Sequence, residues 1–171
     1  GRIMGGAVMV RAKTHVYGDN IDTDRIIPGK YTKTLDMSAL AAHVLEDLDP
    51  KFRERMQIGD VLVAGHNFGT GSSREQAPIA LKTAGVSVVI ARSFARIFYR
   101  NAINIGLPVV EVANHQIEQG HEVEVDLSAG IVINHSTGEK YTATVMPRVM
   151  IDILQAGGLI NYLKIHNDYQ L

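Results

Sequence analysis

Apolar positions in the middle of the chain form three short, nearly continuous runs, at residues 60–64, 86–91 and 107–112. Short apolar runs bounded by turn residues predict strands that are buried on both faces. Two stretches with apolar residues at helical spacing lie between them, at residues 77–84 and 94–105, and a glycine follows each stretch. The β–α–β–α–β order predicts parallel strands in an α/β domain.

The first third of the chain predicts one strand and one helix joined by a loop. Residues 7–17 alternate weakly between apolar and polar positions and end at a Gly-Asp-Asn turn, so they predict the strand. Apolar residues recur at helical spacing over residues 36–48. We expect Asp36 to be the N-cap of this helix and Asp49-Pro50 to end it.

The pattern changes after residue 120. Residues 121–127 alternate strictly, and residues 131–133 and 140–145 form two further short apolar segments separated by glycine-containing turns. Strict alternation is typical of strands with one buried face, so these segments predict antiparallel hairpins. Residues 148–156 predict a last helix, with Val149, Ile153 and Leu154 directed inward and a Gly-Gly pair at its end. The chain as a whole predicts one α/β domain, residues 1–171, with mixed parallel and antiparallel strands.

Length and charge narrow the class of protein. A chain of 171 residues can bury a full core as one domain, and its formal net charge of −1 gives no basic surface for nucleic acid. No stretch approaches the ~20 apolar residues of a membrane span, and the first residues lack the features of a secretory signal. We therefore expect a cytoplasmic protein that binds neither nucleic acid nor membranes. Residues 1–8 are expected to be foreign to the native chain or disordered, with Met4 or Met9 as the native start.

The chain contains no cysteine. This excludes disulfides, a thiolate nucleophile and any iron–sulfur cluster held by thiolates of this chain. The seven histidines are scattered, without the H-x-H or H-x-x-x-H spacing of a metal site. We expect no metal held by this chain alone.

Residues 69–77, Gly-Thr-Gly-Ser-Ser-Arg-Glu-Gln-Ala, combine glycines, two hydroxyls and a guanidinium at an expected helix start. Glycines let backbone N–H groups converge on one point, and a helix N-terminus adds partial positive charge there. Arg74 offers a planar fork that suits a carboxylate. The segment, which we call the serine loop, therefore predicts carboxylate binding; it matches neither the phosphate-binding nor the hydrolase-elbow patterns.

The same residues also fit a purely structural motif. Ser72 with Glu75, and Ser73 with Gln76, have the spacing of a capping box, in which the two side chains satisfy free N–H groups at a helix start. On the loop alone, this capping is the favoured interpretation. Pro78, expected four or five residues into the helix, removes a backbone hydrogen bond and predicts an irregular helix start.

Three sequence blocks, found in a fixed order along the chain, favour a functional role for the serine loop over a purely structural one. They are residues 19–31, Asp-Asn-Ile-Asp-Thr-Asp-Arg-Ile-Ile-Pro-Gly-Lys-Tyr, then residues 65–77, and then residues 93–108. Together they resemble the small subunits of 3-isopropylmalate dehydratase, the detached swivel domains of the aconitase superfamily, over about residues 15–163. The resemblance implies an α/β fold of the swivelling three-layer β/β/α type.

The resemblance also implies an activity. The family members are subunits of heteromeric iron–sulfur hydro-lyases that isomerise 2-isopropylmalate and 3-isopropylmalate by dehydration and rehydration in leucine biosynthesis. The implied cofactor is a [4Fe–4S] cluster. Because this chain has no cysteine, we expect the cluster on a large partner subunit and expect this chain to be inactive alone.

The family pattern assigns roles to particular residues. By resemblance, Ser72 is the catalytic base, and Ser73 and Arg74 hold a substrate carboxylate. A serine oxygen removes a proton near neutral pH only as an alkoxide in a positively polarised site. Asp24 is expected to lie beside the catalytic serine and to orient its loop. Turn and cap chemistry in the aspartate-rich segment 19–24 is an equally supported alternative.

Lys33 lies where the family varies its contacts to the group that distinguishes one substrate from another. A cation there pairs with an extra substrate carboxylate in some members, so Lys33 is a candidate substrate-binding residue, and a solvated surface lysine is the alternative.

Thr70 and Gln76 replace the cysteine and histidine common in the family and are interpreted as tolerated. Arg96 and Arg100 are expected at the partner interface or in ion pairs within this domain, the latter favoured for at least one of them.

Two kinds of alternative function are open at this point. A related small subunit would carry out the same chemistry on another diacid, namely homoaconitate, a citraconate or methylmalate type, or dimethylmalate. A carboxylate-binding or assembly module without chemistry would use the serine loop only as a helix cap.

Overall fold

The computed structural model of the chain describes residues 9–34 and 36–167. The described residues form one seven-stranded sheet with the order β4-β3-β2-β1-β5-β6-β7. Its strands are β1 (Met9–Val16), β2 (Val61–Ala64), β3 (Val88–Ala91), β4 (Val109–Glu111), β5 (Glu122–Asp126), β6 (Ile131–Asn134) and β7 (Lys140–Thr142). The helices are α1 (Thr23–Ile26), the 3-10 turn η1 (Gly29–Tyr31), α2 (Met37–Ala42), α3 (Phe52–Arg55), α4 (Gln76–Ala84), α5 (Arg96–Asn104), α6 (Arg148–Ala156) and α7 (Leu159–Asn167).

The sheet has a parallel half and an antiparallel half that meet at β1. Strands β1 to β4 pair in parallel, whereas β5 pairs with β1 in the antiparallel sense and β6 and β7 continue that pattern. This confirms the mixed strand order expected from the two apolar patterns. Helix α4 connects β2 to β3 and helix α5 connects β3 to β4, since parallel strands that follow one another in the chain need a crossover connection.

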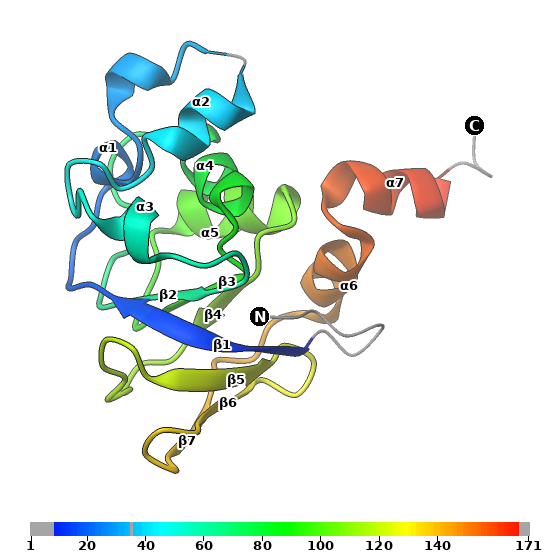
Figure 1. Ribbon diagram of the computed structural model, residues 1–171. Helices are drawn as coiled ribbons and strands as arrows, with labels where there is room; N and C mark the ends of the chain where they lie inside the picture. The colour runs from blue at the N-terminus through cyan, green and yellow to red at the C-terminus, as the bar shows by residue number, and fades with distance from the viewer. Residues whose placement is uncertain (1–8, 35, 168–171) are drawn as a thin grey trace.

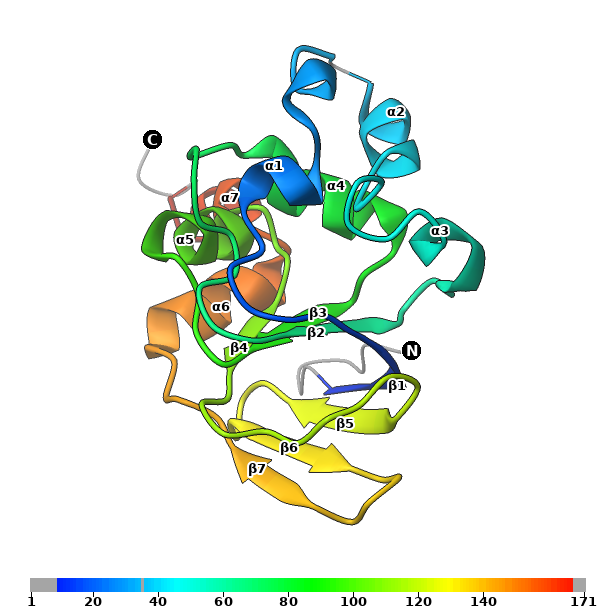
Figure 2. The ribbon, with the colours of Figure 1, turned by 90° about the vertical axis from the view of Figure 1, so that its left-hand side faces the viewer.

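Two hydrophobic cores separate three layers. Alternate residues of β2 enter different cores: Leu62 and Ala64 pack under the helices, whereas Val63 and its neighbours face β5 and β6. Figures 1 and 2 show α1 to α5 above the parallel strands, α6 to one side of them, and β5 to β7 below them. Because the sheet turns back on itself, β2 and β3 are buried on both faces, which explains their continuous apolar runs. The layers are therefore helix, parallel sheet and antiparallel sheet, the expected β/β/α arrangement.

Helix α2 is shorter than the helix predicted over residues 36–48. Asp36 is its N-cap as expected and accepts the N–H of Ser38 at 2.9 Å, but the helix ends at Ala42. Leu45 is fully buried with a φ of +57°, and its N–H is donated to the carbonyl of Ile26 at 2.7 Å. This tertiary hydrogen bond removes the donor that a continuing helix would need, so the prediction was wrong beyond Ala42.

The other predicted helices are present, but some begin or end at other residues than expected, and three further helices in the described part of the chain were not predicted. Helix α4 ends at Ala84 and is capped by Gly85, which has the positive φ, +106°, expected of a helix-ending glycine. Val149 on α6 is half exposed rather than directed inward, and Ile151 is buried in its place. The short helices α1 and α3 and the helix α7, which packs on α6 (Figure 1), were not predicted. The expectation for residues 1–8 lies outside the described residues.

None of the helices in the described ranges combines the length and the apolar character that crossing a membrane requires.

Candidate functional site

Three loops meet at the carboxyl ends of the parallel strands. The loop after β1 leads into α1, the loop after β2 contains the serine loop, and the loop after β3 leads into α5. In open sheets with parallel strands, ligands bind at this edge. The three family-like blocks of the sequence, which are far apart along the chain, therefore supply one shared surface.

Backbone hydrogen bonds join the serine loop to the segment that carries α1. The N–H of Thr23 is donated to the carbonyl of Thr70 at 2.8 Å, and its Oγ1 to the carbonyl of Ser72 at 2.9 Å. The N–H of Gly69 is donated to the carbonyl of Ile21 at 2.7 Å. These bonds fix the path of the serine loop from Gly69 to Ser72. The side chains that follow are therefore held against the start of α1.

Gly69 brings the start of α5 against the serine loop. It has a φ of +87°, and a Cβ atom built on it would lie 2.3 Å from Cγ of Phe98. Gly71 has a similar φ of +92°, but a Cβ atom there would meet nothing closer than 3.5 Å. Glycine at 69 is therefore required by both conformation and packing, whereas glycine at 71 is required by conformation alone.

The capping box expected as a structural alternative is not formed. The N-cap position of α4 is Glu75, which makes no side-chain capping hydrogen bond. Ser72 and Ser73 are exposed, and in the described part of the chain neither hydroxyl has a hydrogen-bond partner. Both hydroxyls are therefore available to a ligand.

Pro78 does not disturb the helix start. It is the third residue of α4, within the first turn, where backbone N–H groups have no partner inside the helix in any case. The predicted irregularity was therefore wrong, because α4 begins only two residues before Pro78 and no helical hydrogen bond is lost.

Arg74 and Asp24 form an ion pair between the serine loop and α1. Nη1 of Arg74 donates to Oδ1 of Asp24 at 3.0 Å, and the N–H of Gly29 donates to the same oxygen at 3.0 Å. The guanidinium of Arg74, followed by the Gly29 N–H, holds the pKa of the Asp24 carboxyl below its ordinary value. Asp22 instead caps α1 by accepting the N–H of Arg25, as the turn and cap interpretation of this segment expected.

A hollow of about 200 Å³ lies between the serine loop and the start of α5. Serine, threonine, arginine and asparagine side chains alternate along its wall with small and apolar groups. Its lining residues are Thr23, Gly69, Gly71, Ser72, Ser73, Arg74, Ala95, Arg96, Ile97, Phe98 and Asn101. This lining contains two arginines and no acidic residue, so the hollow suits an anionic ligand with several hydrogen-bond acceptors.

Three of the predicted site residues thus line one hollow, and Asp24 lies directly behind it. Ser72, Ser73 and Arg74 line the hollow. Asp24 does not line it but forms an ion pair with Arg74, which does. Lys33 is exposed and is not part of the wall. The neighbouring Thr32 is nearer to the serine loop, since its carbonyl accepts the side-chain amide of Gln76 at 3.1 Å.

The α5 side of the hollow was missed by sequence reasoning. Ala95 occupies the N-cap position of α5 and makes no side-chain capping bond, and Arg96, Ile97 and Asn101 complete the wall. Neither Arg96 nor Arg100 forms an ion pair with any described residue, so the favoured expectation of an internal pair was wrong. The sequence carried no signal for this wall, because Ser93 stands directly before the expected helix as a possible cap, and only the structure shows that α5 begins at Arg96.

A polar network supports the serine loop from behind. Asn20 and Asn67 both have left-handed backbones, with φ of +57° and +59°, and Nδ2 of Asn67 donates to Oδ1 of Asn20 at 3.1 Å. Oγ of Ser93 accepts the N–H of Asn67 at 2.9 Å. All three edge loops are therefore joined, and asparagine suits both positions because it adopts a left-handed backbone more readily than other non-glycine residues.

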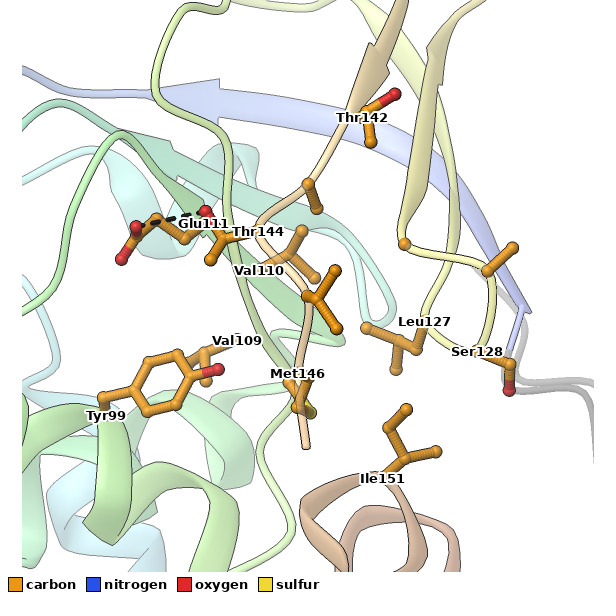
Figure 3. A pocket seen from close by; sticks show the side chains of 14 residues that line it. Tyr99, Val109, Val110, Glu111, Leu127, Ser128, Thr142, Thr144, Met146 and Ile151 are labelled. Carbon is orange, nitrogen blue, oxygen red and sulfur yellow. Dashed lines mark hydrogen bonds between the residues drawn. The ribbon is translucent and has the colours of Figure 1, made fainter. Parts of the chain in front are cut away.

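Figure 3 shows a second pocket, of about 100 Å³, between β4, the chain after β7 and α6. Its walls are mostly apolar, as Val110 and Ile151 illustrate, and Oγ1 of Thr144 donates to Oε1 of Glu111 at 3.2 Å. Burial, with a smaller contribution from Glu111, raises the pKa of Tyr99. The carboxylate of Glu111 would repel an anion, so this pocket does not compete with the hollow as a site for one.

The donor set for a [4Fe–4S] cluster is not supplied by this chain. Such clusters are held by cysteine thiolates, and the 171 residues include none. Within residues 9–34 and 36–167, no group of three or more His, Cys, Asp or Glu side chains could hold a metal ion. The residues present therefore do not fit a cluster.

Comparisons with known proteins identify the family to which the chain is similar. The family model of the aconitase C-terminal domain matches residues 9–115, more than half of the chain. The 3-isopropylmalate dehydratase small subunit of Caldicellulosiruptor bescii is 58% identical over 159 residues, which cover 92% of this chain and 96% of that protein. The corresponding small subunit of Aquifex aeolicus is 56% identical, covering 90% of this chain and 94% of that protein.

A solved structure gives the same result. The crystal structure of 3-isopropylmalate dehydratase (leuD) from Methanocaldococcus jannaschii matches with a TM-score of 0.91 and 44% identity, covering 95% of this chain and 98% of that chain. The chain therefore belongs to the aconitase C-terminal domain family and, within it, to the family of 3-isopropylmalate dehydratase small subunits.

Proposed function

We propose that this chain is the small subunit of a heteromeric hydro-lyase that isomerises 2-isopropylmalate and 3-isopropylmalate by dehydration and rehydration. The observation that carries the proposal is the hollow, which combines two guanidiniums with two serine hydroxyls that have no hydrogen-bond partner among residues 9–34 and 36–167. This is the chemistry needed to hold a hydroxy-dicarboxylate and to move a proton beside one of its carboxylates. The similarity to named small subunits supplies the substrate class.

Arg74 and Ser73 hold one substrate carboxylate. The guanidinium presents parallel N–H donors to two carboxylate oxygens, and the hydroxyl of Ser73, which has no partner within the described ranges, adds a third donor. Asp24 acts as a positioning residue, because its carboxylate fixes Nη1 of Arg74 at 3.0 Å while Gly29 fixes the carboxylate. Asp24 therefore sets the direction of the guanidinium fork.

Ser72 exchanges a proton with the carbon next to a carboxylate. In dehydration, its oxygen takes that proton, the C–O bond of the neighbouring carbon breaks, and a double bond forms between the two carbons; the cluster of the large subunit would supply the Lewis acid that takes up the hydroxide. Rehydration, in which Ser72 returns the proton to one carbon and the hydroxide returns to the other with the two positions exchanged, gives the isomer. The ionised oxygen must be stabilised, since a serine hydroxyl is otherwise far too weak an acid. Arg74 and the uncapped first turn of α5 place positive charge beside it.

The large partner subunit holds the [4Fe–4S] cluster in this proposal. The name small subunit carried by the relatives implies such a partner, and aconitase-type dehydratases are iron–sulfur enzymes. This chain offers no thiolates, so the cluster's ligands come from the partner. The exposed serine loop then faces the partner, and the two subunits complete one site.

The test is a substrate panel with the two subunits expressed together. Turnover is followed by the change in ultraviolet absorbance as the carbon–carbon double bond forms, with 3-isopropylmalate, a methylmalate and dimethylmalate, or disappears on hydration, with homoaconitate. We expect the highest kcat/KM for 3-isopropylmalate and no turnover by this chain alone. A higher kcat/KM for another diacid, or none for any of them, would contradict the proposal.

A further inference from the structure

Arg96 is a second cation in the wall of the hollow. It is the first residue of α5, it is exposed, and it lines the hollow together with Arg74. The packing of Phe98 against Gly69 holds this end of α5 in place, because the approach leaves no room for a Cβ atom at residue 69. The ring of Phe98 also makes an edge contact with Phe68, with centroids 5.1 Å apart. The backbone of Arg96 is therefore held in place by the packing of Phe98.

The two arginines differ in how far their charge is already balanced. Arg74 donates to Asp24 at 3.0 Å, so its charge is shared with a carboxylate of the same chain. Arg96 has no carboxylate within ion-pair distance among the described residues. A dicarboxylate brings two negative charges into the hollow, and the Arg74–Asp24 pair alone cannot balance both.

We infer that Arg96 is a second carboxylate-binding residue, which holds one carboxylate of the hydroxy-diacid while Arg74 holds the other. This inference rests on the proposed function, and it assigns to α5 a role in substrate binding. Ser72 lies in the same wall, so a diacid bound between the two arginines has its central carbons near the serine hydroxyl. Two anchors of this kind restrict the orientation of the substrate as well as its affinity.

Arg100 provides a matched control on the same helix. It lies one helical turn after Arg96, it is also exposed and without an ion pair among the described residues, and it is not part of the wall. The substitutions Arg96→Gln and Arg100→Gln therefore remove the same charge from the same helix. Arg96 lines the hollow and Arg100 does not.

The experiment uses the complex with its large subunit and measures kcat and KM for 3-isopropylmalate at saturating large subunit. We expect Arg96→Gln to raise KM roughly tenfold or more, with kcat changed less than about threefold, as loss of a substrate anchor does. Arg96→Lys should recover part of the loss, since the charge is kept and the fork is not. Arg100→Gln should leave both constants within about twofold.

Three outcomes would overturn the inference. The first is equal KM values for Arg96→Gln and Arg100→Gln. The second is a loss in Arg96→Gln that disappears when the large subunit is raised further, which would make Arg96 an interface residue. The third is a wild-type complex inactive on every diacid of the panel, which also removes the proposed function. If wild type prefers another diacid, the proposed function alone fails, and the same variants are compared on that substrate.

Discussion

Nη1 of Arg74 donates to Oδ1 of Asp24 at 3.0 Å, which joins the serine loop to a helix 50 residues earlier in the chain. The pair leaves the other side of the guanidinium for a ligand. It also orients an arginine whose side chain would otherwise lose considerable conformational freedom on binding. The geometry therefore prepares the loop for a carboxylate before substrate arrives.

Replacement of Asp24 by Asn should weaken the interaction that orients the guanidinium of Arg74. The variant keeps the size of the side chain but loses its charge, so Arg74 is less firmly directed, and we expect KM to rise roughly three- to tenfold. The control is Asp22→Asn, because Asp22 caps α1 and does not contact Arg74. Equal effects of the two substitutions on KM would contradict a positioning role for Asp24.

The same pair predicts a pH dependence of stability. The pKa of Asp24 is lower in the folded protein than its ordinary value of 3.8, mainly because of the hydrogen bond from Arg74. The charged carboxylate therefore raises the free energy of unfolding at pH values above 3.8. This contribution is lost as the pH falls from 3.8 through the lower pKa that Asp24 has in the folded protein. Unfolding curves of wild type and Asp24→Asn should converge across that range; a constant gap would contradict the assignment.

Much of the fold could be predicted because local patterns and tertiary structure agree. The runs at β2 and β3 were recognisable because both faces are buried, and the end of α4 because only glycine takes the φ of +106° at residue 85 easily. The early end of α2 could not be predicted. It depends on a hydrogen bond from Leu45 to Ile26, 19 positions earlier in the sequence, for which the local pattern carries no signal.

The candidate site was predictable on one side only. Ser72, Ser73 and Arg74 belong to one contiguous motif, and the structure has them in one wall. Arg96 joins that wall only because α5 packs closely on Gly69, a contact between elements distant in sequence. The missing capping box was likewise decided by where α4 begins, which differs from the expected start by a few residues.

A comparison of two glycines tests how α5 is held. Gly69→Ala places a Cβ atom 2.3 Å from Phe98 as well as at a φ of +87°, whereas Gly71→Ala meets only the unfavourable φ. We expect Gly69→Ala to lower the free energy of unfolding by about 2–4 kcal/mol and Gly71→Ala by about 1 kcal/mol. Chemical denaturation of the isolated chain measures both, and equal losses would show that α5 does not depend on close approach at residue 69.

Lys33 is expected to have little influence on the isopropylmalate reaction. It is exposed and lies outside the wall of the hollow, so Lys33→Ala should leave kcat/KM for 3-isopropylmalate within roughly threefold. Homoaconitate carries a further carboxylate and serves as the comparison substrate. A fall of roughly 30-fold or more for homoaconitate alone would show that Lys33 contacts that group.

The central claim, that Ser72 carries the proton, is tested most directly by kcat of Ser72→Ala in the assembled complex. Its hydroxyl has no hydrogen-bond partner among the described residues, so the melting temperature of the isolated chain should not change. We predict a fall in kcat of roughly a thousandfold, with KM nearly unchanged, whereas Ser73→Ala mainly raises KM. A Ser72→Ala complex that keeps more than about a tenth of the wild-type kcat would contradict the account.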